Sequence, residues 1–198
     1  MTGVNIATEA SAASNDTTIS GAVDINVTGT GTVNLVGNIV TTGDVNTAGT
    51  GAAGGAVTID TNNGVMTISD ITTSGGASTN TNSNGGAAGA ITITTANNNI
   101  ITLDNSTLTS AGGAQDGSGT QGAGATINFD DPVALTTGTA TITTGATAGN
   151  IAFDQTLNGA QPLSLVAGTG NITFTGLVGN TTEVTSITID TATDVTNV

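Results

Sequence analysis

The residues from Gly55 to Ala123 contain one unit of sequence twice. The first copy begins Gly55-Ala56-Val57-Thr58-Ile59 and the second begins Gly89-Ala90-Ile91-Thr92-Ile93. Each copy continues with a second apolar segment, Val65-Met66-Thr67-Ile68 or Ile100-Ile101-Thr102-Leu103, and then with a polar, glycine-rich loop. Self-similarity at a spacing of roughly 20 to 50 residues predicts a repeat architecture in which each unit buries its apolar face against the next.

The pattern of a glycine, a variable residue and an apolar-polar-apolar triplet recurs along the chain. It begins at Gly21, Gly31, Gly55, Gly89, Gly149 and Gly170, and with one extra residue, interpreted as a bulge or an offset start, at Gly124. Apolar residues that alternate with polar ones indicate strands, and abundant Gly, Thr and Asn disfavour helices. Two to three short strands per coil predict an all-β fold, a parallel β-helix or β-solenoid of about six to seven coils, with Gly/Ala/Ser/Asn-rich loop insertions at one corner.

Alternation also predicts which side chains point inward. The first strand of each coil is expected to supply a core ladder consisting of Val33, Val57, Ile91, Ile127, Ile151 and Ile172, and of Leu35, Ile59, Ile93, Phe129, Phe153 and Phe174. Second strands are expected to contribute Met66/Ile68, Ile101/Leu103, Val133/Leu135 and Leu163/Leu165, and shorter third strands Ile71, Leu108 and Ile142.

The chain is expected to form a single solenoid segment over residues 1–198. Residues 1–20 are interpreted as a cap or partial coil, 21–123 as coils with long loops, and 124–198 as shorter coils. The long loops, Thr42 to Gly54, Gly76 to Ala88 and Gly112 to Ala123, are expected to leave one corner of three successive coils. They are interpreted either as permissive solvent loops or as a stacked ridge that contacts a neighbour or a ligand.

The composition restricts the partners of the protein. The chain has no Lys, Arg, His, Cys, Trp or Tyr, and its net charge is −14 at pH 7. A uniformly acidic surface repels phosphate, which argues against binding to nucleic acid or to anionic membrane surfaces. No apolar run is long enough to predict membrane insertion, and disulfides and thiolate metal sites are excluded.

The densest acidic group is Asp130 and Asp131, followed one coil later by Asp154. Stacking is expected to align Asp60, Thr94, Asp130, Asp154 and Thr175 at the exit of the first strand. Because carboxylates one strand spacing apart repel each other, a calcium ion held by Asp130, Asp131 and Asp154 is one hypothesis, and ordinary turn formation by Asp is the other. A catalytic pair of carboxylates is disfavoured because no basic side chain is present to hold an acidic sugar, so the chain is not expected to be an enzyme and no other cofactor is expected.

A binding function on a flat surface is a further hypothesis. The outward Thr and Asn residues are typical of ice-binding solenoids, but the row is interrupted at Asn34, Asn128 and Ala152. Thr is also simply favoured at exposed strand positions. A glycan-binding surface usually exposes Tyr or Trp, and this chain has neither.

The residues from Gly149-Asn150-Ile151-Ala152-Phe153 to Thr173-Phe174-Thr175-Gly176 resemble the repeats of filamentous-haemagglutinin-like and autotransporter-like bacterial surface proteins. The segment from Val178 to Ile189 is similar to the same pattern. The resemblance implies a right-handed β-helix that is secreted or anchored at a bacterial cell surface as a stalk, a biofilm matrix fibre or an adhesin. No functional residue of this chain is assigned from the resemblance.

The expected function is therefore that of a structural, non-enzymatic segment of an extracellular bacterial filament or adhesin. Its expected partners are other copies, end to end or laterally, or further repeats of the same polypeptide. The alternative is a calcium-dependent module or one that binds a glycan or ice surface.

Overall fold

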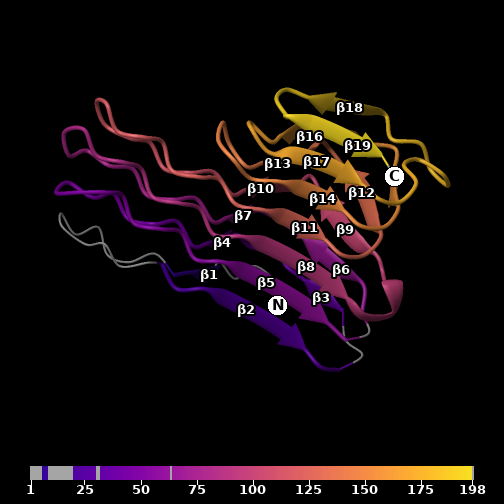
Figure 1. Ribbon diagram of the computed structural model, residues 1–198. Helices are drawn as coiled ribbons and strands as arrows, with labels where there is room; N and C mark the ends of the chain where they lie inside the picture. The colour runs from indigo at the N-terminus through magenta and orange to yellow at the C-terminus, as the bar shows by residue number, and fades with distance from the viewer. Residues whose placement is uncertain (1–5, 9–19, 30–31, 63, 198) are drawn as a thin grey trace.

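The computed structural model describes residues 6–8, 20–29, 32–62 and 64–197. These residues form three all-parallel sheets, stacked coil upon coil from the N-terminal to the C-terminal end (Figure 1). The parallel β-helix expected from the alternation is therefore confirmed. One short 3-10 turn, η1 (Ala96–Asn98), interrupts the strands, and no helix formed by the described residues is long and apolar enough to span a membrane.

The strands of each sheet follow one another along the axis. Sheet A consists of β1 (Ile6–Ala7), β4 (Ile39–Val40), β7 (Ile71–Thr72), β10 (Thr107–Thr109), β13 (Ala140–Thr143), β16 (Pro162–Val166) and β18 (Ser186–Ile189). Sheet B consists of β2 (Val23–Val27), β5 (Val57–Thr61), β8 (Ile91–Thr95), β11 (Ile127–Phe129), β14 (Ile151–Phe153), β17 (Asn171–Phe174) and β19 (Asp194–Asn197). Sheet C consists of β3 (Val33–Asn34), β6 (Met66–Ile68), β9 (Ile101–Asp104), β12 (Val133–Thr137) and β15 (Leu157–Asn158).

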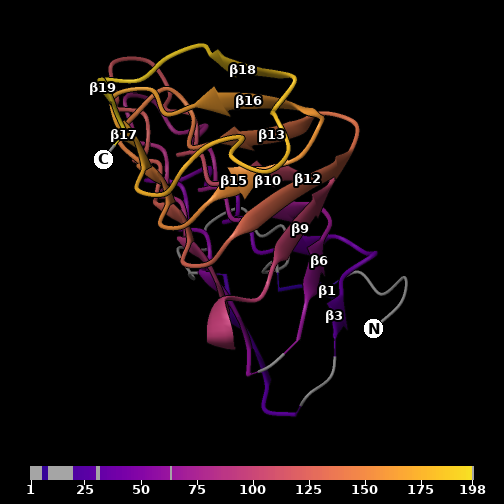
Figure 2. The same cartoon turned by 90° about the vertical axis from the view of Figure 1, so that its right-hand side faces the viewer.

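The chain visits the sheets in the order B, C, A and then returns to B, and Figure 2 shows the strands of sheet C stacked in sequence from β3 to β15. Residues in register on sheet B define the coils, and they are Val23, Val57, Ile91, Ile127, Ile151, Ile172 and Val195. Successive coils are therefore 34, 34, 36, 24, 21 and 23 residues long. The N-terminal coils carry the extra residues, as expected.

The core follows the predicted ladder on sheet B. The side chains of Val57, Ile91, Ile127, Ile151 and Ile172 are stacked in register and fully buried. In the neighbouring column the rings of Phe129, Phe153 and Phe174 stack with centroids 4.9 and 5.2 Å apart. Because stacked identical side chains fill the same shape in each coil, the interior is packed continuously along the axis.

Two parts of the expected ladder are wrong. Val33 and Leu35 are buried, but Val33 pairs with Met66 in sheet C, and Val23 occupies the position below Val57 in sheet B. Leu163 pairs with Ala140 in sheet A, so the second strand of that coil contains Leu157 instead. The reason is that the first coil contains the same glycine-led pattern at both Gly21 and Gly31, and alternation gives the facing of a strand but not its sheet.

The three long loops follow β4, β7 and β10, and they stack as a flat projection that we call the wing, residues 41–56, 73–90 and 110–126 (left side of Figure 1). Each layer has an outward leg that continues from sheet A and a return leg that leads into sheet B. The expectation that the loops leave one common corner is confirmed.

Hydrogen bonds in the wing recur every third residue. Amide groups of Gly51, Gly54 and Val57 donate to carbonyl groups of the next layer, and those of Gly85, Ala88 and Ile91 do the same one layer higher, at 2.9 to 3.0 Å. Within one layer the two legs are also joined, as by the bond of 2.8 Å from Gly86 N to Gly76 O. A three-residue period without bonds inside a leg is the signature of a polyproline II conformation, whereas a strand would repeat every two residues.

Glycine is required where the legs meet. A Cβ atom on Gly76, Gly86 or Gly113 would lie far inside 3.0 Å of a backbone carbonyl group on an adjacent leg. None of these three glycines has a positive φ, so the close approach of the backbones and not an unusual conformation excludes a side chain. The legs are therefore a packed, stacked ridge and not permissive loops, while its contact with a neighbour or ligand stays a prediction.

A row of buried hydroxyl groups closes the base of the wing. Thr41 Oγ1 donates to Gly55 O at 2.5 Å, and Thr73 Oγ1 donates to Gly89 O at the same distance. Ser110 Oγ lies 3.2 Å from Ala125 O, across its own loop, and 2.8 Å from Gly89 O in the coil below, and in the next, short coil Thr144 Oγ1 donates to Gly149 O at 2.7 Å. This hydroxyl clamp joins the end of a sheet A strand to the start of a sheet B strand whether the loop between them is long or short.

Candidate functional site

The aligned acidic residues lie at the exit of sheet B. The backbone amides of Asp130, Asp154 and Thr175 bond to consecutive coils below them, which confirms the expected stack. Thr94 Oγ1 donates to Asp130 Oδ2 at 2.6 Å, and the Asn128 side-chain amide donates to Asp130 Oδ1 and, at 3.3 Å, to Asp154 Oδ2. Neutral donors thus bridge the two carboxylates.

Asp131 is not part of this group. Its side chain is buried, and its Oδ2 accepts a hydrogen bond of 2.6 Å from the backbone amide of Thr95 one coil below. It follows directly after the sheet B exit, at the corner where Thr61 and Thr95 are buried in the preceding coils. Its role in this structure is to stabilise a turn.

The three predicted calcium ligands therefore do not converge on one point. Among the described residues, no cluster of three or more His, Cys, Asp or Glu side chains is placed to hold a metal ion. Both oxygens of Asp130 already accept hydrogen bonds, and Asp131 faces the protein. The set fits a shared calcium ion poorly, and calcium binding stays a prediction for measurement.

A column of mostly apolar side chains, three of them exposed and two half-buried, lies at the corner between sheets B and C. The column, here named the corner stripe, consists of Val65, Ile100, Pro132, Thr156 and Leu177. The residue after each stripe position donates a backbone hydrogen bond to the stripe residue of the next coil, as Met66 N does to Ile100 O and Ile101 N to Pro132 O. The stripe residues therefore follow one another along the solenoid axis. Val65, Ile100 and Leu177 are 44%, 45% and 64% exposed, although each precedes a residue that faces inward.

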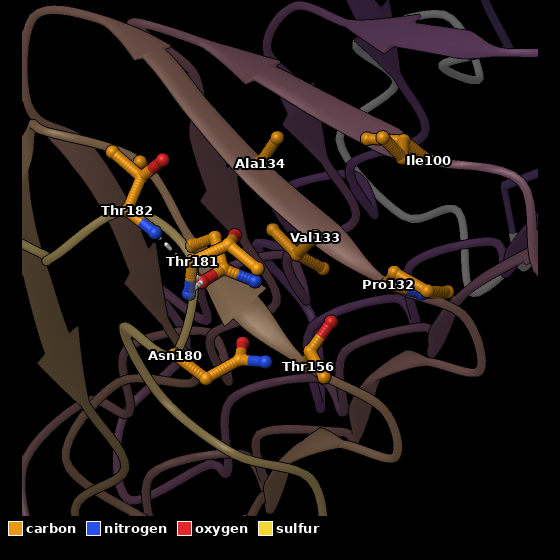
Figure 3. A pocket seen from close by; sticks show the side chains of 10 residues that line it. Ile100, Pro132, Val133, Ala134, Thr156, Asn180, Thr181 and Thr182 are labelled. Atoms are coloured by element: carbon orange, nitrogen blue, oxygen red, sulfur yellow. Dashed lines mark hydrogen bonds between the residues drawn. The ribbon is translucent and has the colours of Figure 1, made fainter.

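A groove of about 450 Å³ lies beside the corner stripe on the outer face of sheet C (Figure 3). Ile100, Pro132, Val133 and Ala134 form its apolar side, and residues 180–182 form the opposite wall. Hydroxyl and amide groups of Thr156, Asn158, Asn180, Thr181 and Thr182 complete the lining. None of the ten lining residues is ionisable, although the chain carries 14 carboxylates.

The polar wall is held in place by hydrogen bonds to β15. Asn158 Oδ1 accepts bonds from the backbone amides of Thr181 and Thr182 at 3.0 and 3.3 Å. Gly159 N donates to Thr182 O at 3.1 Å, and Gly179 N donates to Leu157 O at 2.8 Å. The wall is thus attached to the solenoid at several points, which gives the groove a defined shape.

Sequence reasoning missed this surface, although a signal was present. Three of the second strands, β6, β9 and β12, begin directly after an apolar residue, which gives the pairs Val65-Met66, Ile100-Ile101 and Pro132-Val133, where strict alternation allows only one residue to point inward. The surplus apolar residue faces solvent at the corner. The opposite groove wall has no such signal, because it comes from a segment 24 residues beyond Asn158 at its farthest point.

The outward row on sheet B does not form a regular threonine array. In register it reads Asp24, Thr58, Thr92, Asn128, Ala152, Thr173 and Thr196. The predicted interruptions at Asn128 and Ala152 are in this row, and Asn34 lies in sheet C, where it pairs with Thr67.

Comparison with known proteins gives no further assignment, because no family model, curated protein or solved structure matches this chain.

Proposed function

We propose that this protein is a non-enzymatic structural segment of a secreted or cell-surface bacterial fibre or adhesin, in which copies add end to end as a stiff rod. The observation that carries the proposal is the apolar surface left uncovered on the coil of β18 and β19, on which a further coil, from another copy or from the same polypeptide, can stack. The sequence resemblance to bacterial surface repeats supports an extracellular location.

The last coil leaves its inward columns uncovered. Leu163, Leu165 and Ile172 are fully buried, but the residues stacked above them, Ile187, Ile189 and Val195, are 38%, 36% and 46% exposed. Every residue of β18 and β19 is exposed, so two strand edges with free backbone groups surround this apolar surface. An uncovered edge of this kind is a template for another strand.

A coil of the same kind fits this end. At the other end, β2 is the outermost strand of sheet B among the described residues and runs parallel to β19, so the two edges present backbone groups with the same polarity. A contact between the C-terminal end of one copy and the N-terminal end of another is heterologous and does not close, and it therefore generates a filament. Val195 would then stack on the Val23 column of the next copy.

Assembly is tested with the variant Ile187→Lys, which places a charge in the uncovered column. We expect the unmodified protein to form rods of increasing length with concentration, as measured by light scattering and electron microscopy, and the variant to remain as single particles. Lysine on an edge strand is the device by which natural sheets prevent such pairing.

The control is Val65→Lys, which replaces an aliphatic residue of similar exposure in a middle coil with the same charge. This control should assemble like the unmodified protein. Single particles of the unmodified chain at all concentrations, or equal loss of assembly in both variants, would contradict end-to-end addition.

A further inference from the structure

The corner stripe and the groove form one continuous surface. Ile100, Pro132 and Thr156 belong to both, and Leu177 extends the stripe toward the C-terminal end. Four strand spacings separate Val65 from Leu177, so the stripe is about 19 Å long. Exposed aliphatic side chains that line up beside a concave apolar site are typical of interaction surfaces.

The charge beside this surface is of one sign. Asp130 and Asp154 precede Pro132 and Thr156 by two residues each, so their Cα atoms lie within about 7 Å of the stripe. Both carboxylates are only partly buried. The chain contains no Lys, Arg or His that could pair with them, so the compensating charge has to come from outside the chain.

We propose that the corner stripe and the groove are a docking surface for a basic, amphipathic polypeptide segment. Aliphatic side chains of the segment would pack on Ile100, Pro132 and Ala134 in the groove. Its lysine or arginine side chains would extend across the stripe to Asp130 and Asp154. Asn180 and Thr156 would offer hydrogen bonds to its backbone.

Charge complementarity selects this occupant over a second copy. A second copy would bring another set of aspartates, with no cation, against Asp130 and Asp154, and like charges across an interface are unfavourable. The apolar side of the groove also disfavours a purely ionic partner such as oligolysine, which gains nothing from burying Ile100 and Pro132. The surface lies on the side of the solenoid, and its function does not depend on end-to-end assembly.

The test uses a short labelled peptide in which lysine and leucine alternate, and fluorescence anisotropy measures its Kd. Oligolysine of equal charge and a peptide of alternating glutamate and leucine are the comparators. We expect the lysine-leucine peptide to bind more tightly than oligolysine, and the acidic peptide not to bind. Raising the salt from about 0.02 to 0.3 M should weaken binding without abolishing it, because only the ionic part is screened.

Variants locate the binding surface. Ile100→Ser, at an exposed position, should raise the Kd about fivefold, and so should the pair Asp130→Asn with Asp154→Asn at low salt. The control pair Asp190→Asn with Asp194→Asn removes the same charge from the turn between β18 of sheet A and β19 of sheet B, and should change the Kd less than about twofold. Melting curves establish that each variant is folded.

Three results would overturn the proposal. An equal rise in the Kd for the Asp130/Asp154 double variant and for the Asp190/Asp194 double variant would mean that the peptide responds only to the net charge of −14. An unchanged Kd for Ile100→Ser would exclude the stripe and groove. Equal binding of the lysine-leucine peptide and a neutral serine-leucine peptide or a neutral oligosaccharide would show that the surface selects uncharged ligands.

Discussion

The solenoid body and the wing belong to the same coils, but neighbouring coils pack through different atoms in the two regions. In the body, strands repeat every two residues and the contact between coils consists of buried side chains such as Ile91 and Phe129. In the wing, the legs repeat every three residues and the contact consists of backbone against backbone at Gly76, Gly86 and Gly113. The first region needs large apolar residues, whereas the second excludes a side chain at each of these glycines.

The difference shows how low-complexity sequence can specify structure. The wing has almost no apolar side chains to bury, so its order rests on interleg hydrogen bonds and close backbone contacts. Glycine loses much conformational entropy when it is ordered, and hydrogen bonds within each layer and between adjacent layers of the wing offset this loss. The hydroxyl clamp at Thr41, Thr73 and Ser110 lies where the two regions meet.

The largest effect is expected from Ile91→Asp in the body. This substitution places an unpaired carboxylate between Val57 and Ile127, and it should lower the free energy of unfolding by more than about 4 kcal/mol. Urea denaturation followed by circular dichroism measures the change. Ile91→Val is the control and should cost about 1 kcal/mol. A melting curve of Ile91→Asp like that of the parent would mean that the register of sheet B is wrong.

A methyl group should disrupt the wing while sparing the body. Gly86→Ala brings a Cβ atom against the carbonyl group of Ala52 in the layer below, which should cost about 1–3 kcal/mol, mostly as local opening. Amide hydrogen exchange should be faster at residues 73–90 and unchanged in β8 and β11. Gly49→Ala, at a position with room for a Cβ atom, should leave exchange as it is. Equal exchange in the two variants would show that the legs are not packed.

A smaller effect is expected at the hydroxyl clamp. Thr41→Val keeps the shape of the side chain but leaves Gly55 O without the hydroxyl donor, at a cost of about 1–2 kcal/mol. Faster exchange at residues 41–56 and a lower melting temperature are the measurements. The neighbouring Thr42→Val alters a half-buried hydroxyl and should stay within about 0.5 kcal/mol of the parent. If both variants behave alike, the clamp does not stabilise the base of the wing.

The smallest effect is expected from calcium. Both carboxylate oxygens of Asp130 accept hydrogen bonds from neutral donors, and the Asp131 carboxylate accepts one from the Thr95 amide. Millimolar calcium should therefore change the melting temperature by less than about 2 °C relative to chelator. A larger rise that is lost in Asp154→Asn would establish a calcium site in spite of these hydrogen bonds. A rise that persists in that variant would indicate general screening of the charge of −14.

The sequence by itself determined the fold class and the facing of most strands. Alternation is a local property, and it identifies Val57, Ile91, Ile127, Ile151 and Ile172 as inward residues without knowledge of any partner. The unequal spacing of the glycine-led strands also indicated that insertions leave one corner of the coils. The candidate surface was only partly visible, as a surplus apolar residue at Val65 and Ile100.

Only the tertiary structure decided which coil lies against which segment. The sheet to which Val33 belongs, the packing of the legs at Gly86 and the direction of the Asp131 carboxylate all depend on contacts with residues about 34 to 36 positions away. The groove depends in the same way on the wall at residues 180–182, which Asn158 holds through the backbone amides of Thr181 and Thr182. Alternation predicts the direction of a side chain relative to its own strand. These features depend instead on the lengths of whole coils, because coil length decides which residues are stacked on each other. The residues near a position in the sequence do not indicate which residue will be stacked on it.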